Sequence, residues 1–319
     1  METERPSPRY SGIDVWDTAD IVDAMVEGQL AAVAAVRAAR PMIECAAVAI
    51  EARLKNERGR LIYAGAGTSG RLAVQDGAEL IPTFNWPRER LLLLMAGGMD
   101  ALLKSIEGAE DEVEDARTLA QWHAIGPDDV LIAVAASGST PFTLACMREA
   151  KRLGALTIGI ANNRGTPILE EADHPIWLDT GTEPIAGSTR MKAGTAQRVT
   201  LTVLSSVVMI LLGRVYEGLM VDLQAVNDKL VRRSEAILRR LTNRSPQEVR
   251  AALDRAGGNL KLAALLLHGC DLQKAISTLE RSGGQLRKAL ALTGTPVSGP
   301  FDIDDGNLTA ETDQLALKP

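Results

Sequence analysis

The stretch Arg60-Leu-Ile-Tyr-Ala-Gly-Ala-Gly-Thr-Ser-Gly70 decides the fold of this chain. Its first part, Arg60–Ala64, is a short apolar run that predicts a buried strand, and a glycine-rich turn that opens a helix follows it. The spacing of Gly65, Gly67 and Gly70 also matches the dinucleotide-binding fingerprint, which expects an acidic residue at the end of the next strand. The next predicted strand, Leu91–Ala96, ends in two glycines, so the fingerprint alone is weak.

Further strands and helices alternate along the chain and predict βαβ units with a parallel sheet. We expect the remaining strands at Val130–Ala135, Leu156–Ile160 and Pro175–Leu178, and helices at Leu72–Leu80, Ala101–His123, Thr140–Leu153 and Thr189–Gly213, the last long and buried. Before the sheet, Asp14–Arg58 has helical spacing broken near Pro41 and predicts two helices.

After Gly213 the strand signals stop and charged helical segments take over. The segment Arg255-Ala-Gly-Gly-Asn-Leu-Lys-Leu-Ala repeats as Arg281-Ser-Gly-Gly-Gln-Leu-Arg-Lys-Ala. Each Gly-Gly pair is expected to end one helix, with Asn259 or Gln285 beginning the next. The last stretch, Thr293–Pro319, has little periodicity and predicts a mobile tail.

Composition limits the classes of partner. The 319 residues carry a net charge of −6 and include 46% hydrophobic but only 3% aromatic residues. No basic stripe with interleaved aromatics is present, so we expect no nucleic-acid partner. The three cysteines form no CxxC pair, and the three histidines share no ligand spacing, so we expect neither a disulfide framework nor a metal site. The polar start predicts no signal peptide, and the longest apolar stretch, Val199–Leu212, is too short for a bilayer.

Two loops rich in hydroxyl groups follow predicted strands and open helices. The first carries Gly67, Thr68 and Ser69, and the second runs from Ser137 through Gly138, Ser139 and Thr140 to Pro141. Hydroxyls beside free backbone N–H groups at a helix N-terminus suit a phosphate monoester, although each loop alone could be a capped turn. Because the carboxyl ends of parallel strands lie at one edge of the sheet, the two loops are expected to face one sugar-phosphate pocket.

A third motif, Gly187-Ser-Thr-Arg-Met-Lys-Ala-Gly-Thr-Ala-Gln197, precedes the long buried helix. Ser188 or Thr189 is the expected N-cap. Arg190 and Lys192 fall in the first turn, where the helix dipole disfavours cations. Their presence points to a nearby anion, which could be a substrate phosphate or a carboxylate of the protein itself.

With these motifs, together with Glu107-Gly-Ala-Glu-Asp111, the chain resembles the N-acetylmuramic acid 6-phosphate etherases, a sugar isomerase (SIS) domain family related to glucokinase regulatory protein. The resemblance runs from about Leu54 to Leu290. It implies an α/β fold: a parallel-sheet SIS domain, a flavodoxin-like sandwich, over residues 51–214, after a helical segment over 1–50 and before a small helical (UBA-like) domain over 215–292. One departure is Ser139, where this family is expected to carry Arg.

The resemblance also implies an activity. The chain would be a cofactor-free lyase of peptidoglycan recycling, which would split the D-lactyl ether of N-acetylmuramate 6-phosphate in a homodimer with composite active sites. The scattered cysteines fit a reducing compartment, so we expect a cytoplasmic protein. By the same resemblance, Glu79 is the acid that protonates the leaving lactate and Glu110 the base at C2. Substrate binding falls to Gly67, Thr68, Ser69, Ser137, Gly138, Ser139, Thr140, Ser188 and Lys192, with no metal.

The surroundings of the two carboxylates differ in the sequence. Glu79 stands between apolar neighbours, where an isolated carboxylate is costly unless it is used or paired. Glu110 lies in an acidic run that by itself indicates a solvated surface. Along a straight helix Glu79 would lie about 15 Å from Ser69. We therefore expect either that Gly77 ends or bends the helix, or that Glu79 serves the phosphate loops of a partner subunit.

Two other functions fit the same pattern. A hexose-phosphate aldose–ketose isomerase would need one base at C1 and C2 and no acid at C3. A non-catalytic sugar-phosphate sensor would need neither carboxylate. The presence of both Glu79 and Glu110 favours the etherase.

Overall fold

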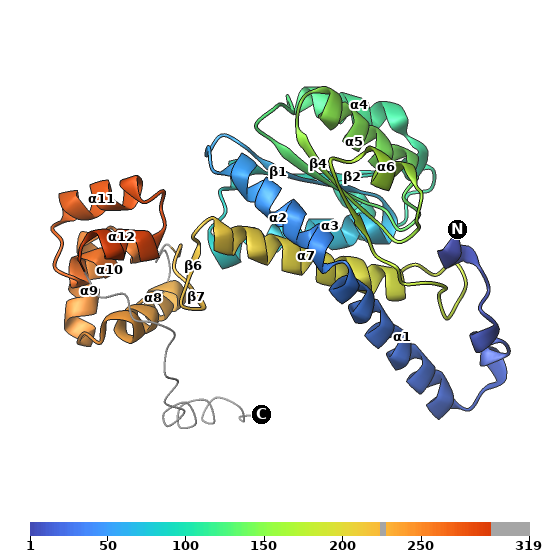
Figure 1. The fold of residues 1–319 in the computed structure, drawn as a ribbon, viewed down its shortest axis with the longest axis horizontal. Helices are drawn as coiled ribbons and strands as arrows, with labels where there is room; N and C mark the ends of the chain where they lie inside the picture. Colours follow the sequence, from blue (N-terminus) through green and yellow to red (C-terminus); the bar gives the residue numbers. More distant parts are fainter. Residues whose placement is uncertain (224–227, 295–319) are drawn as a thin grey trace. The chain divides into compact units, whose positions relative to one another are not determined.

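The structure, a computed structural model, describes residues 1–223 and 228–294, and the predicted tail lies, from residue 295 on, outside the described residues. The chain divides into two compact units between Ser234 and Glu235 (Figure 1). The first unit contains α1 (Thr18–Ala38), α2 (Arg40–Leu54), β1 (Leu61–Gly65), α3 (Gly67–Phe84), β2 (Leu91–Met95), α4 (Val113–Trp122), β3 (Val130–Val134), α5 (Pro141–Arg152), β4 (Leu156–Ala161), α6 (Pro167–Glu171), β5 (His174–Trp177), α7 (Lys192–Leu211), β6 (Val215–Tyr216) and β7 (Leu219–Met220).

The first unit is built on a parallel five-stranded sheet in the order β2-β1-β3-β4-β5. Side chains alternate across the sheet, so that Tyr63 and Ile132 belong to the core under α2, α3 and α7, while Ile62 and Leu131 belong to the core under α4 and α5. Figure 1 shows α4, α5 and α6 on one face and α2, α3 and α7 on the other. This confirms the predicted α/β fold with a parallel sheet.

Glycines let α3 lie unusually close to the strands beneath it. A Cβ atom on Gly70 would lie 2.7 Å from the backbone of Gly65 and 2.4 Å from the sulfur of Met95. One on Gly77 would lie 2.7 Å from Leu93 and 3.2 Å from the ring of Tyr63. Gly77 therefore serves close helix–sheet packing, and α3 runs through it without a break. The expectation that Gly77 ends this helix is wrong.

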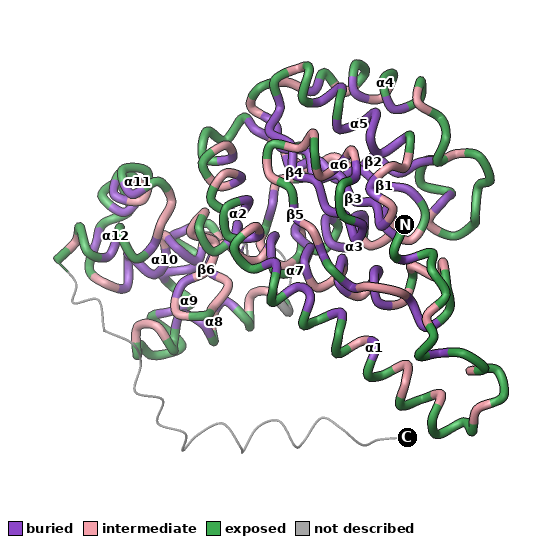
Figure 2. Tube along the Cα trace, turned by 45° about the vertical axis from the view of Figure 1, so that its right-hand side comes forward, coloured by how far each residue is buried: buried purple, intermediate pink, exposed green. Residues whose placement is uncertain are grey.

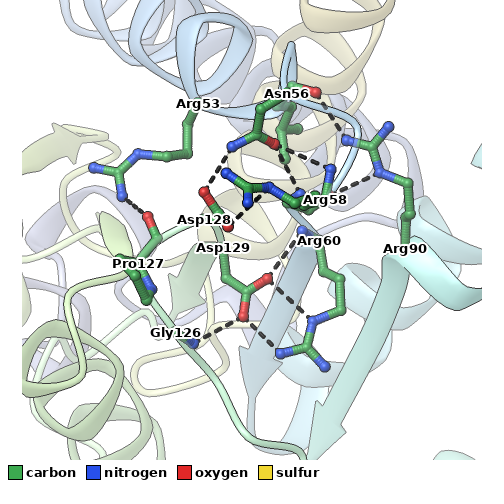
Figure 3. Close-up of polar contacts among 11 residues, drawn as sticks. Arg53, Asn56, Arg58, Arg60, Arg90, Gly126, Pro127, Asp128 and Asp129 are labelled. Atoms are coloured by element: carbon green, nitrogen blue, oxygen red, sulfur yellow. Dashed lines mark hydrogen bonds and ion pairs between the residues drawn. The ribbon is translucent and has the colours of Figure 1, made fainter.

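An ion pair stabilises the edge of the sheet at which β1 and β3 begin. Arg60 donates from Nε to Asp129 Oδ1 at 3.0 Å and from Nη2 to Oδ2 at 2.6 Å (Figure 3). The same carboxylate accepts the backbone N–H groups of Arg60 and Gly126, each at 3.0 Å. Such a two-pronged pair is geometrically specific, so it aligns the start of β1 with the start of β3.

The five strands of the sheet are confirmed to within one residue at either end, and four other predictions need correction. The helix expected over Leu72–Leu80 is longer at both ends, as α3. The helix expected over Ala101–His123 is present only as α4, because the chain before it forms short 3₁₀ turns around Gly108, which has φ +77°. The long helix begins at Lys192 rather than Thr189. Beyond Gly213, where no strand was expected, β6 and β7 pair as an antiparallel hairpin.

The long helix α7 is a core element. Among the described helices it alone is long and apolar enough to cross a membrane, but 50% of its apolar window is buried inside the protein. It contacts α1, α2 and α3. Figure 2 shows, by contrast, that α1 is exposed along most of its length.

The second unit is helical. It contains the end of α8 (Asp228–Thr242) and all of α9 (Pro246–Arg255), α10 (Leu260–Leu267), α11 (Leu272–Arg281) and α12 (Leu286–Leu292). As predicted, each Gly-Gly pair follows a helix, with Asn259 at the start of α10 and Gln285 at the start of α12. The Asn259 side chain caps its helix by accepting from Leu262 N at 3.0 Å.

The close packing of α3 predicts a large effect of a single methyl group. We expect Gly70→Ala to lower the free energy of unfolding by about 3 kcal/mol, because the added carbon meets backbone atoms that cannot move aside cheaply. Gly126→Ala is the matched control, since its Cβ would meet nothing closer than 4.0 Å. Urea unfolding of both variants measures the difference. Equal midpoints would contradict the packing described for α3.

Candidate functional site

The candidate site lies at the carboxyl edge of the sheet, where the loops after β1, β2 and β3 come together. These strands are neighbours and parallel, with Gly65 opposite Met95 on one side and Val134 on the other. The loop after β1 therefore lies between the other two. The two hydroxyl-rich loops predicted from the sequence follow adjacent strands, as the shared pocket requires.

The first hydroxyl loop opens directly into α3. Gly67 is the first residue of the helix and has φ +51°, a conformation that favours glycine. Ser69 is buried and Thr68 half-buried. A Cβ on Gly194 would lie 3.6 Å from the methyl group of Thr68, so the start of α7 lies beside this loop. The first and third motifs of the sequence thus meet in the folded chain.

The second hydroxyl loop, Ser137–Thr140, is held by its own hydrogen bonds. The Ser137 hydroxyl accepts from Ser139 N at 3.2 Å and lies 3.1 Å from the Thr140 hydroxyl. Gly138 has φ +70°, and a Cβ there would lie 2.0 Å from the Thr166 hydroxyl oxygen. Only glycine fits this position, and α5 begins directly after Thr140.

A cavity of about 210 Å³ adjoins the first loop on the β2 side. Its lining includes Gly67, Arg71 and Met95 together with Lys104, Glu107 and Glu110. Glu110 is exposed and lies on a 3₁₀ turn, Ala109–Asp111, that follows Gly108. The structure therefore brings the predicted base to the loop that carries Thr68 and Ser69.

The predicted acid, Glu79, is not part of this cavity. It lies on the unbroken helix α3, and it is exposed rather than enclosed by its apolar neighbours, which corrects the expectation of a buried carboxylate. The buried carboxylate of this helix is Asp76. It accepts from the Tyr63 hydroxyl at 3.0 Å and pairs with Arg198 at 3.2 Å, and burial raises its pKa.

The start of α7 is capped by a carboxylate that sequence reasoning missed. Glu183 is fully buried and accepts from the backbone N–H groups of Lys192 at 2.9 Å and Ala193 at 2.8 Å. The helix is preceded by Met191, not Ser188 or Thr189 as expected. The anion inferred from the cations of this motif is thus present in the protein itself. The sequence feature that could have identified Glu183 as a cap is an acidic residue between Gly181 and Pro184, in a loop that leads to a helix.

Lys192 is buried with its ammonium group donating to Thr180 O at 2.7 Å. Burial lowers the pKa of this ammonium, and the negative charge of Glu183 opposes that shift. Ser188 is half-buried in the turn just before the helix. The roles of these two residues in substrate binding stay predictions.

Residues near the N-terminus join two of the loops. Asn163, itself buried, accepts from Glu2 N at 2.7 Å and donates to Ala136 O at 2.8 Å, directly before Ser137. The carbonyl of Thr3 accepts from Gly187 N at 3.0 Å, beside Ser188. The Ser137 loop and the Ser188 turn are therefore fastened to the same short segment.

Two cations of the cavity were also missed as candidate functional residues. Arg71 follows the first loop directly, near the N-terminus of α3, where the helix dipole disfavours a cation. A cation at this unfavourable position could have identified Arg71 as a candidate functional residue. Lys104 stands in a segment that the sequence indicated to be plain helix. In the described part of the chain, no three His, Cys, Asp or Glu side chains gather as metal ligands would.

Comparisons with known proteins lead to the same family as the sequence motifs. Residues 43–151 match the family model of the glucokinase regulatory protein N-terminal SIS domain. The N-acetylmuramic acid 6-phosphate etherase of Deinococcus radiodurans is 46% identical over 289 residues, which covers 90% of this chain and 94% of the relative. That of Streptomyces coelicolor is 43% identical over 91% of this chain and 94% of the relative. Among solved structures, a phosphoheptose isomerase from Francisella tularensis aligns with a TM-score of 0.45 and 20% identity, covering 61% of this chain and all of that one.

The buried cap of α7 yields a stability prediction. We expect Glu183→Gln to lower the free energy of unfolding by about 2–4 kcal/mol, because the amide replaces one of the two acceptor oxygens by a donor NH2 group and leaves the buried Lys192 without its nearby negative charge. Glu170→Gln, at an exposed position, is the control and should change little. Thermal unfolding of both variants at neutral pH measures the difference. A Glu183→Gln protein as stable as the control would show that the cap is dispensable.

Proposed function

Since the chain belongs to the N-acetylmuramic acid 6-phosphate etherase family, we propose that it cleaves the D-lactyl ether of N-acetylmuramate 6-phosphate, giving N-acetylglucosamine 6-phosphate and D-lactate. The enzyme is then a carbon–oxygen lyase. The match to etherases across nine-tenths of the chain carries the proposal. The cavity that joins Glu110 to the start of α3 supports it.

The chemistry needs a base and an acid. In the open-chain sugar the aldehyde makes the C2 proton acidic, and Glu110 removes it. The bond between C3 and the ether oxygen then breaks, and Glu79 supplies the proton that leaves with D-lactate. Water adds to C3 of the resulting unsaturated aldehyde and gives up a proton to Glu79, while Glu110 returns one to C2. The substrate and one water together give N-acetylglucosamine 6-phosphate and D-lactate. Positioned carboxyl groups speed such proton transfers by about 10²–10⁴-fold.

Phosphate binding falls to the two hydroxyl loops. Thr68, Ser69, Ser137, Ser139 and Thr140 surround the N-termini of α3 and α5, where backbone N–H groups and the helix dipole favour an anion. The N-terminus of α7 differs, because Glu183 already accepts from its first N–H groups. We therefore expect the phosphate between the loops that follow β1 and β3, with the sugar extending toward the cavity that Glu110 lines.

Glu79 reaches this sugar from a second subunit. It lies about 15 Å along α3 from Ser69, and the helix is unbroken between them. Because α3 does not end at Gly77, we infer a homodimer in which Glu79 of the partner subunit completes each site.

The exposed face of α1 supports a dimer. Val22, Val26, Leu30 and Val33 recur at helical spacing on α1 and are 47–67% exposed. On α7, Val203 and Ile210 are 40% and 52% exposed. Apolar rows of this kind are typical of helices that pack against another chain.

The wider setting follows from the substrate. A phosphorylated sugar derived from peptidoglycan places the reaction in peptidoglycan recycling and in the cytoplasm. The net charge of −6 gives no support to a nucleic-acid or anionic-membrane partner. We keep the division into a helical segment over residues 1–50, an SIS domain over 51–214 and a helical domain over 215–292.

The first functional test is release of D-lactate from N-acetylmuramate 6-phosphate. We expect the wild-type protein to release it and Glu79→Gln to lower kcat by about 10²–10⁴-fold. Because Glu79 is exposed, the unfolding midpoint should stay unchanged. Glu89→Gln, also exposed, is the control for loss of a surface charge. A Glu79→Gln enzyme with normal turnover would remove Glu79 from the mechanism, and a wild-type protein that releases no D-lactate would remove the etherase.

The shared site is tested by mixing two defective proteins. In a heterodimer of Glu79→Gln and Ser137→Ala chains, one site combines the intact loops of the first chain with the intact Glu79 of the second. We expect activity to return when the proteins are mixed under conditions that let subunits exchange. No recovery, although exchange is shown by differently tagged chains, would mean that Glu79 does not act across the dimer.

A further inference from the structure

The cavity beside Glu110 contains positive charge that the proposed proton transfers do not use. Arg71 and Lys104 line it together with Glu107 and Glu110. In the described part of the chain, no carboxylate lies within ion-pair distance of either cation, and neither has a role in the two proton transfers.

The Arg71 side chain is held in place by backbone groups. Its Nε donates to Ala101 O at 3.0 Å and its Nη2 to Lys104 O at 3.3 Å. Both acceptors belong to the segment that follows β2 and carries Lys104 into the cavity lining. A guanidinium anchored in this way keeps further N–H groups free, and its planar donor pattern matches a carboxylate.

The order of the strands places this cavity on the far side of the first loop from Ser137. The Ser137 loop follows β3, the Gly67 loop follows β1 between them, and the cavity adjoins β2. A substrate whose 6-phosphate lies between the loops after β1 and β3 would therefore direct its C2 and C3 end, with the ether at C3, toward Arg71 and Glu110.

The group at C3 is small and negatively charged. The lactyl group adds about five non-hydrogen atoms to the 3-oxygen, and a cavity of about 210 Å³ has room for roughly seven waters, so the group fits. Its carboxylate would lie near Glu107 and Glu110, and like charges that close repel unless cations offset them. Arg71 and Lys104 are the cations at this place.

We propose that Arg71, assisted by Lys104, binds the carboxylate of the lactyl group and makes the enzyme specific for an acidic 3-O-substituent. The proposal rests on the etherase function. It assigns the two cations to the part of the substrate that distinguishes N-acetylmuramate 6-phosphate from other hexose phosphates.

The test compares two substrates on matched variants. One substrate is N-acetylmuramate 6-phosphate, and the other is its lactyl amide, which is the same size but neutral. We expect the wild-type enzyme to prefer the acid by about 10–100-fold in kcat/KM, the range for a hydrogen bond to a charged group. Arg71→Met should remove most of that preference by slowing the acid, with little change for the amide, and Arg71→Lys should keep part of it.

Two further variants separate recognition from structure. Among the residues that the structure describes, the Lys104 side chain makes no hydrogen bond that holds the segment after β2. Lys104→Met should therefore reduce the preference for the acid substrate without disturbing the fold. Arg58→Met, at an exposed ion pair on the opposite edge of the sheet, should leave both substrates unaffected.

Three results would overturn the proposal. An equal loss on both substrates in Arg71→Met would make Arg71 a structural residue only. A wild-type enzyme with no preference for the acid, or a preference that survives both cavity variants, would exclude these cations from carboxylate binding. A wild-type protein that releases no D-lactate from the acid would instead refute the etherase itself, so the two failures are distinguishable.

Discussion

The close approach of α3 to β1 and β2 is the constraint on which the candidate site depends. Gly70 lies against the backbone of Gly65, and Gly77 lies against Leu93 and Tyr63, with no room for a side chain at either glycine. This contact sets where the N-terminus of α3 meets the edge of the sheet. The helix α3 continues unbroken through Gly77, and so places Glu79 about three turns from the loop that carries Ser69. One packing constraint thus fixes both the position of the Gly67 loop and the distance of Glu79 from it, on which the proposals of a phosphate site and of a second subunit rest.

The site also depends on which helix N-termini remain available to a ligand. The first N–H groups of α7 are already satisfied by the buried carboxylate of Glu183, whereas α3 and α5 open directly from hydroxyl-rich loops. The protein therefore uses one N-terminus for its own stability and presents two to solvent at adjacent strands. The segment around Thr3 and Asn163 ties the Ser137 loop to the turn before α7, so the loops that would surround a sugar phosphate are fixed relative to one another.

Local patterns in the sequence predicted the sheet and the loops, because short apolar runs and glycine turns are determined by nearby residues. The motifs also identified the family, which the comparisons confirm. Packing between residues far apart in the chain could not be predicted from these local patterns. Gly77 looked like a helix end, but its role follows from Leu93 and Tyr63, which touch it only in the folded chain. The segment around Glu110 was expected to be helical, and only the structure shows a 3₁₀ turn that lines the same cavity as Arg71. Glu183 was missed because the N–H groups that it caps are contributed by residues nine and ten positions away.

The central claim is that elimination and rehydration occur at C2 and C3 of the sugar. Turnover of N-acetylmuramate 6-phosphate in deuterium oxide enriched in heavy oxygen tests it most directly, with both products analysed by mass spectrometry and NMR. The account predicts deuterium at C2 and heavy oxygen in the 3-hydroxyl of N-acetylglucosamine 6-phosphate, with no heavy oxygen in D-lactate. Heavy oxygen in the lactate, or a product that keeps its original hydrogen at C2, would contradict the mechanism assigned to Glu110 and Glu79.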